Sequence, residues 1–276
     1  MKKIILITGA SSGIGKDSAL QLIKEGHIVY GAARRVEKMQ DLVAAGGKAI
    51  KMDVTREEDV KATVQQVLKE QGKIDVLFNN AGYGLFGAVE LITIEEARRQ
   101  FDVNIFGLAR MTKEVIPLMR EQGKGTIINM SSVGGKVYSP FGAWYHGTKH
   151  ALEGWSDCLR LELKPFNIDV VLIEPGAIAT EFGSLMYDGI LERSQGTPYE
   201  RSTKIMAEET DKIFSAEGKL SPPSVISKLV VKAVRAKKPK TRYVAGKYSS
   251  SMLILRKYFS DRLFDKIYEM LLYRKR

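Results

Sequence analysis

The chain has 276 residues and a formal net charge of +11, with 44% apolar and 27% charged residues, which excludes a disordered or fibrous protein. Its single cysteine, Cys158, excludes an internal disulfide framework and a multi-cysteine metal site. The apolar run that follows the basic start is only Ile4–Ile7, too short for a signal-peptide core or a membrane-spanning helix, so we expect a cytoplasmic protein.

Short apolar runs alternate with stretches of helical periodicity along most of the chain. We expect strands at 4–7, 27–33, 48–52, 74–78, 126–130, 168–173 and 242–245. We expect helices at about 16–24, 60–68, 94–122, 143–166 and 225–238. Nearly continuous apolar strands that alternate with helices are typical of an α/β fold, whose parallel sheet is covered on both faces. We therefore predict one doubly wound domain over residues 1–250.

Residues 177–222 interrupt this pattern, with no clear period and with Pro198, Pro222 and Pro223. An irregular insert of this length inside a compact domain is functional, disordered or partly helical, and the pattern does not decide which.

A glycine turn follows the first expected strand and opens the first helix. It reads Thr8-Gly9-Ala10-Ser11-Ser12-Gly13-Ile14-Gly15. Glycines let the backbone approach a pyrophosphate, and the helix that follows presents unpaired N–H groups to the anion. The turn therefore predicts a nucleotide site in a Rossmann-type fold, although many strand-to-helix turns use glycine only structurally.

The end of the second strand indicates which dinucleotide is bound. An NAD site places a carboxylate there to accept from the ribose hydroxyl, whereas this chain has Arg34 and Arg35 and no acid. A guanidinium matches a phosphate, so we expect NADP(H) in preference to NAD(H). The alternative is a pair of solvated arginines that open a helix.

Tyr145 and Lys149 are four residues apart on an expected helix and therefore share a face. A cation beside a tyrosine favours the phenolate, which would lower the tyrosine pKa toward neutral acid/base work. Ser132 ends the fifth strand, at the edge where open α/β sheets bind ligands. Taken separately, Tyr145 and Lys149 would be an ordinary surface pair on a helix, and Ser132 would be part of a turn.

Together with Asp53-Val54, Asn79–Gly82, Asn104 and Pro175-Gly176, these motifs make the sequence resemble the short-chain dehydrogenase/reductase family over about residues 1–250. The resemblance implies hydride transfer between a nicotinamide and a carbonyl or alcohol. Tyr145 would be the acid/base, Lys149 would lower its pKa and bind ribose, Ser132 would orient the substrate oxygen, and Asn104 would support a water-linked relay to Lys149.

The resemblance also implies a set of residues for the cofactor. The set comprises Gly9, Ser11, Ser12, Gly13, Ile14, Gly15, Arg34, Arg35, Asp53, Val54, Asn80, Ala81, Gly82, Tyr145, Lys149, Pro175, Gly176, Ile178 and Thr180. His146 and His150 have a metal-like spacing but no accompanying carboxylates, so we predict no metal. Cys158 has apolar neighbours, and we expect it in the core.

Segment 177–222 corresponds to the family's variable substrate lid. Apolar residues predominate in the lid and in the expected active-site loops: Phe182, Leu185, Met186, Tyr187, Ile190 and Leu191, then Tyr83, Phe86, Val137, Tyr138 and Phe141. The sequence also resembles the hydroxysteroid and retinol dehydrogenase branch. We therefore expect a lipophilic substrate, such as a steroid-, retinoid- or long-chain-like carbonyl or alcohol, although the same residues could be ordinary core.

The positive charge is concentrated at the end of the chain, since residues 218–276 hold 16 basic and three acidic residues. Apolar residues recur every three or four positions at Met252, Leu255, Phe259, Leu263, Ile267 and Leu271, which predicts one amphipathic helix over 252–273 within a C-terminal segment, 251–276. This segment could lie on an anionic membrane, or it could pack on the lid or on a second subunit.

Two other functions are weighed against a dehydrogenase: a hydride-using isomerase or dehydratase, and a non-enzymatic NADP-binding sensor. The presence of Ser132, Tyr145 and Lys149 favours the enzyme. We expect a homo-oligomer, a dimer or tetramer, by analogy with the family, and no nucleic acid partner, because no recognition module accompanies the basic tail.

Overall fold

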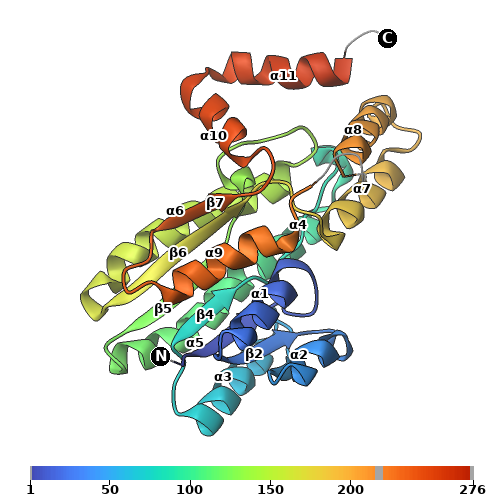
Figure 1. Cartoon of the computed structure of the whole chain (residues 1–276). Coiled ribbons are helices and arrows are strands. Elements are labelled where there is room, and N and C mark those ends of the chain that lie inside the picture. Colours follow the sequence, from blue (N-terminus) through green and yellow to red (C-terminus); the bar gives the residue numbers. More distant parts are fainter. Residues whose placement is uncertain (1, 215–219, 274–276) are drawn as a thin grey trace.

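The structure is a computed structural model that describes residues 2–214 and 220–273. Seven parallel strands in the described part form one sheet in the order β3-β2-β1-β4-β5-β6-β7 (Figure 1). They are β1 (Ile4–Thr8), β2 (Ile28–Ala33), β3 (Lys48–Lys51), β4 (Val76–Asn79), β5 (Gly125–Met130), β6 (Ile168–Pro175) and β7 (Arg242–Ala245). The predicted α/β fold with a doubly wound parallel sheet is confirmed, and the strand order reverses between β1 and β4.

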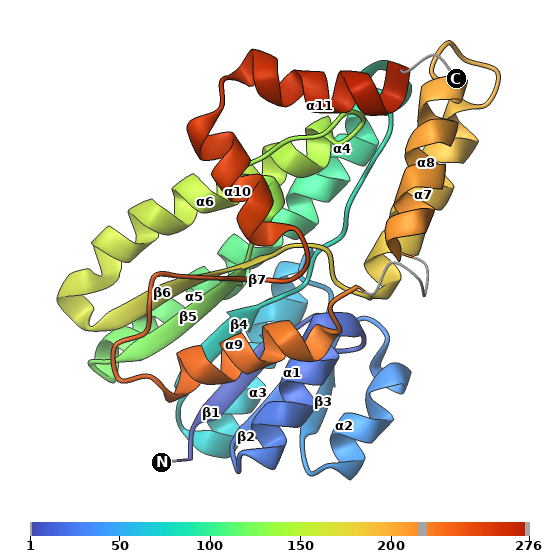
Figure 2. The ribbon, with the colours of Figure 1, turned by 45° about the horizontal axis from the view of Figure 1, so that its top comes forward.

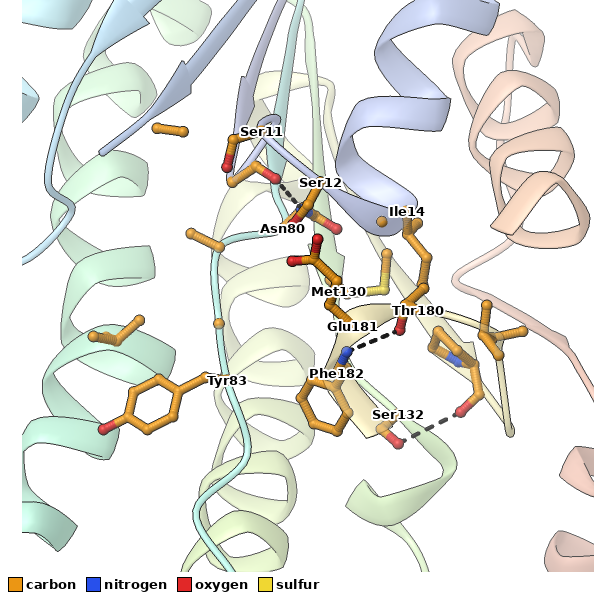
Figure 3. Close-up of a pocket in the computed structure, with 18 of the residues that line it drawn as sticks. Ser11, Ser12, Ile14, Asn80, Tyr83, Met130, Ser132, Thr180, Glu181 and Phe182 are labelled. Atoms are coloured by element: carbon orange, nitrogen blue, oxygen red, sulfur yellow. Dashed lines mark hydrogen bonds between the residues drawn. The ribbon is translucent and has the colours of Figure 1, made fainter. Parts of the chain in front are cut away.

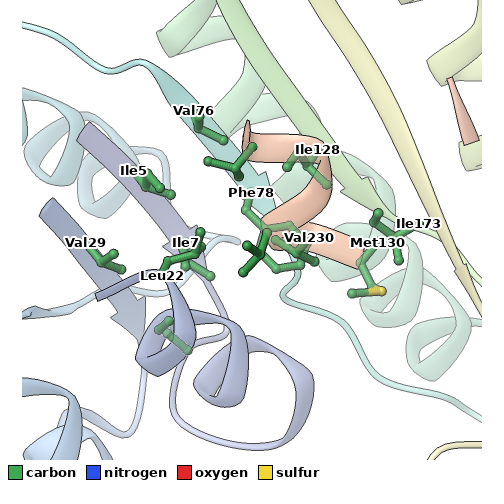
Figure 4. Close-up of a cluster of buried hydrophobic side chains, with 14 of the residues drawn as sticks. Ile5, Ile7, Leu22, Val29, Val76, Phe78, Ile128, Met130, Ile173 and Val230 are labelled. Atoms are coloured by element: carbon green, nitrogen blue, oxygen red, sulfur yellow. The ribbon is translucent and has the colours of Figure 1, made fainter. Parts of the chain in front are cut away.

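Helices cover both faces of the sheet. On one face lie α1 (Gly13–Lys24), α2 (Gln40–Ala44) and α9 (Pro223–Arg235), and on the other lie α3 (Glu57–Gln71), α5 (Leu108–Glu121) and α6 (Ala143–Leu163). Successive strand residues point to opposite faces, so Ile5 and Ile7 belong to one buried cluster and Ile4 and Leu6 to the other. Figure 4 shows the first cluster, in which Leu22 of α1 and Val230 of α9 pack against the strands.

The helix expected over 94–122 is interrupted by a π-helical turn. It consists of α4 (Ile94–Phe101), a π-helical segment (Asp102–Gly107) and α5. Such π segments are frequent at functional sites because they redirect one side chain without ending the helix. Here the segment carries the predicted site residue Asn104.

Residues 177–222 are largely helical in their described part, with α7 (Glu181–Ser194) and α8 (Glu200–Phe214) packed as a pair. The pair follows the carboxyl end of β6 and stands beside the sheet (Figure 2). Among the described side chains of the pair, Ile190 packs beside Phe86 and Tyr145 and not in either cluster that covers the sheet. The pair therefore lacks the sheet-facing apolar stripe on which the other helices were predicted.

The single helix predicted over 252–273 is wrong. The chain forms α10 (Ser249–Tyr258) and α11 (Asp261–Tyr273), separated by an extended Phe259 with φ −111° and ψ 146°. The break lets Phe264 turn inward, where it is 2% exposed and its ring lies 5.0 Å from that of Tyr138. In the described ranges no helix is both long and apolar enough to span a bilayer.

Candidate active site

A cleft of about 380 Å³ opens at the carboxyl ends of the central strands, where the strand order reverses. Residues from the turn after β1, the loop after β4, the end of β5 and the start of α7 all line it (Figure 3). Ligands of open α/β sheets bind at this position, because the loops on either side of the reversal diverge and leave a crevice.

The glycine turn forms one wall of the cleft. Gly9 has a φ of +68°, and a Cβ at this position would lie 2.8 Å from Ala81 Cα, so only glycine fits between the β1 and β4 loops. A Cβ on Gly15 would collide with the side chain of Asn80 and with the carbonyl of Gly9. Asn80 Nδ2 donates to the carbonyl oxygens of Thr8 and Gly9, both at 3.1 Å, and so fastens the two loops together.

The amino end of α1 faces the cleft without a side-chain cap. Ser12 occupies the cap position but accepts no hydrogen bond from the helix backbone; its Oγ instead accepts from Arg35 at 3.4 Å. The first N–H groups of the helix and its positive dipole end therefore suit an anionic group at this end of the cleft.

Arg34 and Arg35 are exposed and line the cleft beyond the end of β2. Arg35 also lies 3.7 Å from the carboxylate of Glu181, the first residue of α7. Asp53, on the loop after β3, accepts from the backbone and hydroxyl of Thr55 at 2.9 and 2.8 Å. Burial opposes ionisation of Asp53, but these hydrogen bonds and the charge of Arg34 outweigh it and lower the pKa of Asp53.

Tyr145 and Ser132 meet in the interior of the cleft. Tyr145 is 8% exposed on α6, and Ser132 lies two residues beyond the end of β5, where its Oγ accepts from the Gly134 N–H at 3.0 Å. Burial raises the pKa of Tyr145 to about 12, and a hydrogen bond with Ser132 partly opposes this. At neutral pH the phenol therefore carries its proton and can donate it.

Lys149 lies one helical turn beyond Tyr145. Its Nζ donates to the carbonyl oxygen of Met130 at 2.8 Å and lies 5.9 Å from the centre of the Tyr145 ring. Burial lowers the pKa of Lys149 to about 8, and the charge of Glu153 opposes that shift. The lowering of the Tyr145 pKa expected from this lysine is therefore not observed: burial raises that pKa, and the opposing influence is the hydrogen bond with Ser132.

Asn104 lies behind the cleft and is 3% exposed. Its Oδ1 accepts from the Tyr83 N–H at 3.1 Å, and its Nδ2 donates to the Tyr83 carbonyl at 2.9 Å and to Thr148 Oγ1 at 3.2 Å. Asn104 thus joins the loop after β4 to α6, one residue before Lys149.

The cleft is lined by every predicted cofactor residue except Gly15, which packs behind the turn. It is also lined by every predicted catalytic residue except Asn104. The lining residues that were not predicted are Ala32, Ala33, Met52, Val103, Met130, Ser131, Ala177 and Glu181. Most of them lie at or just after strand ends, Glu181 begins α7, and Val103 lies on the π segment. Position in the fold, and not residue type, identifies them.

Aromatic rings pack against the ring of Tyr145. The rings of Phe86 and Phe182 lie 5.3 and 5.5 Å from the Tyr145 ring, and Ile190 and Phe141 complete a small apolar cluster. Tyr83 also lines the cleft. The side chains of Leu185, Met186 and Tyr187 lie outside the described part of the structure.

Tyr138 and Cys158 do not lie where the sequence predicts, and His146 is held by hydrogen bonds on α6. Tyr138 turns away from the cleft toward α11, where its hydroxyl donates to Asp265 at 3.0 Å. His146 hydrogen-bonds with Ser139 and the Gly134 carbonyl. Cys158 is exposed and not in the core, because the buried face of α6 runs through Leu152, Ser156 and Leu159.

The sequence matches the short chain dehydrogenase family over residues 3–188. A 3-ketodihydrosphingosine reductase of Bacteroides thetaiotaomicron is 46% identical over 180 residues, which cover 65% of each chain, just under two thirds of that relative. A crystal structure of a short-chain dehydrogenase from Streptomyces avermitilis superimposes with a TM-score of 0.80 at 33% identity, covering 98% of this chain and 97% of that one. A structure of actinorhodin polyketide ketoreductase with NADPH has a TM-score of 0.72 at 32% identity, covering 84% and 89%.

A nucleotide-type cleft in a doubly wound sheet, with a buried tyrosine beside a serine and a lysine, defines an oxidoreductase of the dinucleotide-binding class. The chain belongs to the short-chain dehydrogenase family, whose fold binds NAD(P) and whose members act on small-molecule carbonyl or alcohol substrates.

Proposed function

We propose that the protein interconverts a carbonyl and a secondary or primary alcohol with NADP(H), with Tyr145 as the acid/base. The observation that carries this proposal is the pairing of the buried, protonated Tyr145 with Ser132 inside the cleft that contains the glycine turn. In reduction, Tyr145 donates its proton to the carbonyl oxygen while Ser132 holds that oxygen in place. Bound NADPH would supply the hydride for the carbonyl carbon.

The residues of the cleft fit this cofactor. The turn Gly9–Gly15 leaves room for a pyrophosphate at the start of α1, and Asp53 and Val54 lie where an adenine would sit. Asn80–Gly82, Lys149 and the segment Pro175–Thr180 would hold the ribose and nicotinamide end. Thr180 Oγ1 already accepts from the Phe182 N–H at 3.4 Å and caps α7.

The preference for NADP(H) rests on the exposed Arg34 and Arg35 and on the absence of a carboxylate at the end of β2. Arg34→Asp should raise the Michaelis constant for NADPH by about 10-fold or more, with little change for NADH, since the variant loses a phosphate contact. Arg201→Asp, an exposed position on α8, is the matched control. Equal Michaelis constants for wild type and Arg34→Asp would contradict the preference.

We propose a lipophilic substrate, of steroid-, retinoid- or long-chain-like type, in keeping with the hydroxysteroid and retinol dehydrogenase branch. Phe86, Phe182 and Ile190 pack around Tyr145. The Bacteroides relative, which matches over 180 residues, is named as a reductase of 3-ketodihydrosphingosine. NADPH oxidation across a panel of ketones and aldehydes ordered by size and polarity tests this. Turnover that rises with apolar chain length supports it, and turnover confined to small polar sugars contradicts it.

We also propose that the enzyme is a cytoplasmic homo-oligomer. Ile94 on α4 and Phe106 on the π segment are 51% and 53% exposed and lie along one groove, a face that a second copy could cover. Sedimentation velocity should show a dimer or tetramer that Phe106→Ser weakens, and a monomer for the wild type would overturn the assembly.

A further inference from the structure

The two C-terminal helices form an arm, α10–α11, that rests on the protein body by one side only (Figure 2). Phe264 is 2% exposed, and its ring packs 5.0 Å from Tyr138, whose hydroxyl donates to Asp265. The Arg256 guanidinium lies 5.4 Å from the centre of the same tyrosine ring. The arm is thus fixed to the loop that follows Ser132, and α11 also packs against α8.

The opposite side of the arm exposes large apolar side chains. On α11, Leu263, Ile267 and Met270 are 45, 40 and 57% exposed, and their spacing of four and three residues places them on one helical face. On α10, Ile254 and Tyr258 are 55 and 70% exposed and are likewise four residues apart. We call these five side chains the outer face.

Cations border the outer face. On α11, Lys266 lies one helical turn from both Leu263 and Met270, and Arg262 lies one turn before it. On α10, Lys257 lies one turn after Ile254, and its Nζ is 5.2 Å from the centre of the Tyr258 ring. All three are exposed.

Two of the three acids on α11 are engaged by the protein itself: Asp261 pairs with Arg256 at 2.5 Å, and Asp265 accepts from Tyr138. The third, Glu269, is exposed. Exposed apolar side chains flanked by lysine and arginine fit an interface of anionic headgroups over acyl chains. A second copy of the same face would bring like charges together, which disfavours self-association.

We propose that the outer face docks on an anionic lipid bilayer. The arm contacts both the active-site loop and α8, so docking brings the catalytic end of the sheet to the membrane surface. A lipophilic substrate could then enter from the bilayer, a consequence that rests on the proposed function, whereas docking itself does not.

Co-sedimentation with phosphatidylcholine vesicles, with and without phosphatidylserine, tests the proposal on the full-length protein. The wild type should sediment with the anionic vesicles, and added salt should weaken binding. The variant Leu263→Ser/Ile267→Ser should need at least about 10-fold more lipid for half-binding, because two apolar side chains no longer leave water. The matched control is Leu161→Ser/Val89→Ser, at positions 65 and 59% exposed elsewhere on the surface.

A second pair of variants tests the charges without changing apolar area. Lys257→Gln/Lys266→Gln should lose most of the preference for anionic vesicles, whereas Lys24→Gln/Lys69→Gln, at exposed positions on α1 and α3, should retain it. Wild-type protein that fails to sediment with any vesicle overturns the proposal. So does a sedimentation-velocity result in which Leu263→Ser/Ile267→Ser dissociates an oligomer, since a second copy would then cover the outer face. Vesicle binding is measured without substrate, so it is independent of the proposed reaction.

Discussion

The chemistry of the site depends on how deeply two side chains are buried. Desolvation raises the pKa of Tyr145 to about 12 and lowers the pKa of Lys149 to about 8, so the two shifts have opposite signs and one cause. The tyrosine is held as a proton donor, and the lysine titrates close to neutral pH. These protonation states suit the carbonyl reduction proposed above.

Tyr145→Phe removes the donor hydroxyl but keeps the ring that packs on Phe86. We expect ketone reduction to fall by about 10²- to 10⁴-fold, the usual contribution of a positioned general acid. NADPH affinity, followed by cofactor fluorescence, should change by less than about threefold. Phe141→Leu, in the same apolar cluster, serves as the packing control. Turnover in the Tyr145→Phe variant that matches the wild type would refute the assigned role.

The rate of reduction should depend on pH through Lys149. In the proposed mechanism the charge of Lys149 would help to bind the ribose and would stabilise the phenolate left when Tyr145 gives up its proton. This charge is present below the lysine pKa of about 8 and is lost above it. We expect kcat for reduction to be flat from pH 6 to 7 and to fall above about pH 8. Lys149→Met should be slow at every pH and lack this fall; an unchanged pH profile in the variant would assign the titration to another group.

At the scale of elements, a partly buried ionic cluster joins four segments next to the site. Arg242 of β7 pairs with Glu153 and Asp157 of α6 at 3.1 and 2.7 Å and with Glu174 of β6 at 3.0 Å. Lys136, on the loop after Ser132, lies 3.2 Å from Glu153. Glu174 directly precedes Pro175 and Gly176 of the cleft, so the cluster fixes the loops that carry cofactor and catalytic residues.

Glu174 is 1% exposed, and burial, reinforced by the charge of Glu153, raises its pKa to about 7. The folded state therefore binds this proton more tightly than the unfolded state, and stability falls as pH rises from about 5 to 7. Glu174→Gln should remove this fall: relative to wild type, its free energy of unfolding in urea should improve by on the order of 2 kcal/mol between pH 5 and 8. The exposed Glu162→Gln is the control, and a difference that does not vary with pH would contradict the prediction.

At the scale of the whole molecule, the protein is a catalytic body with an appended arm. The body buries its helices on both faces of the sheet, whereas α10–α11 is held mainly through Phe264 and the polar contacts around Tyr138. An arm with so small a buried contact opens more readily than the sheet does.

Phe264→Ala should release the arm, because truncation of a buried phenylalanine costs about 3 kcal/mol. We expect amides of residues 249–273 to lose hydrogen-exchange protection while those of β1 and β4 keep theirs. Phe259→Ala, at a position 42% exposed, should leave protection of the arm unchanged. Equal protection in Phe264→Ala and wild type would show that other contacts hold the arm.

The strands, the glycine turn and the Tyr145–Lys149 pair were predictable because each depends on a local pattern. Apolar runs report strands buried on both faces, and glycine is required wherever a Cβ would meet a neighbouring loop, as at Gly9. The tail was mispredicted because its period of three to four residues continues across Phe259, where the chain bends to bury Phe264. Cys158 was misplaced because it lies just off the buried face of α6.

The sequence by itself determined the fold class and the family, and it supplied the residues proposed for the catalytic and cofactor sites, since these depend on residue type and spacing along the chain. Only the tertiary structure decided that burial, and not Lys149, dominates the pKa of Tyr145, that Tyr138 serves the arm and not the cleft, and which side of the arm is covered. These properties depend on which surfaces meet across long sequence separations, and periodicity shows that a helix has an apolar face without showing what covers it.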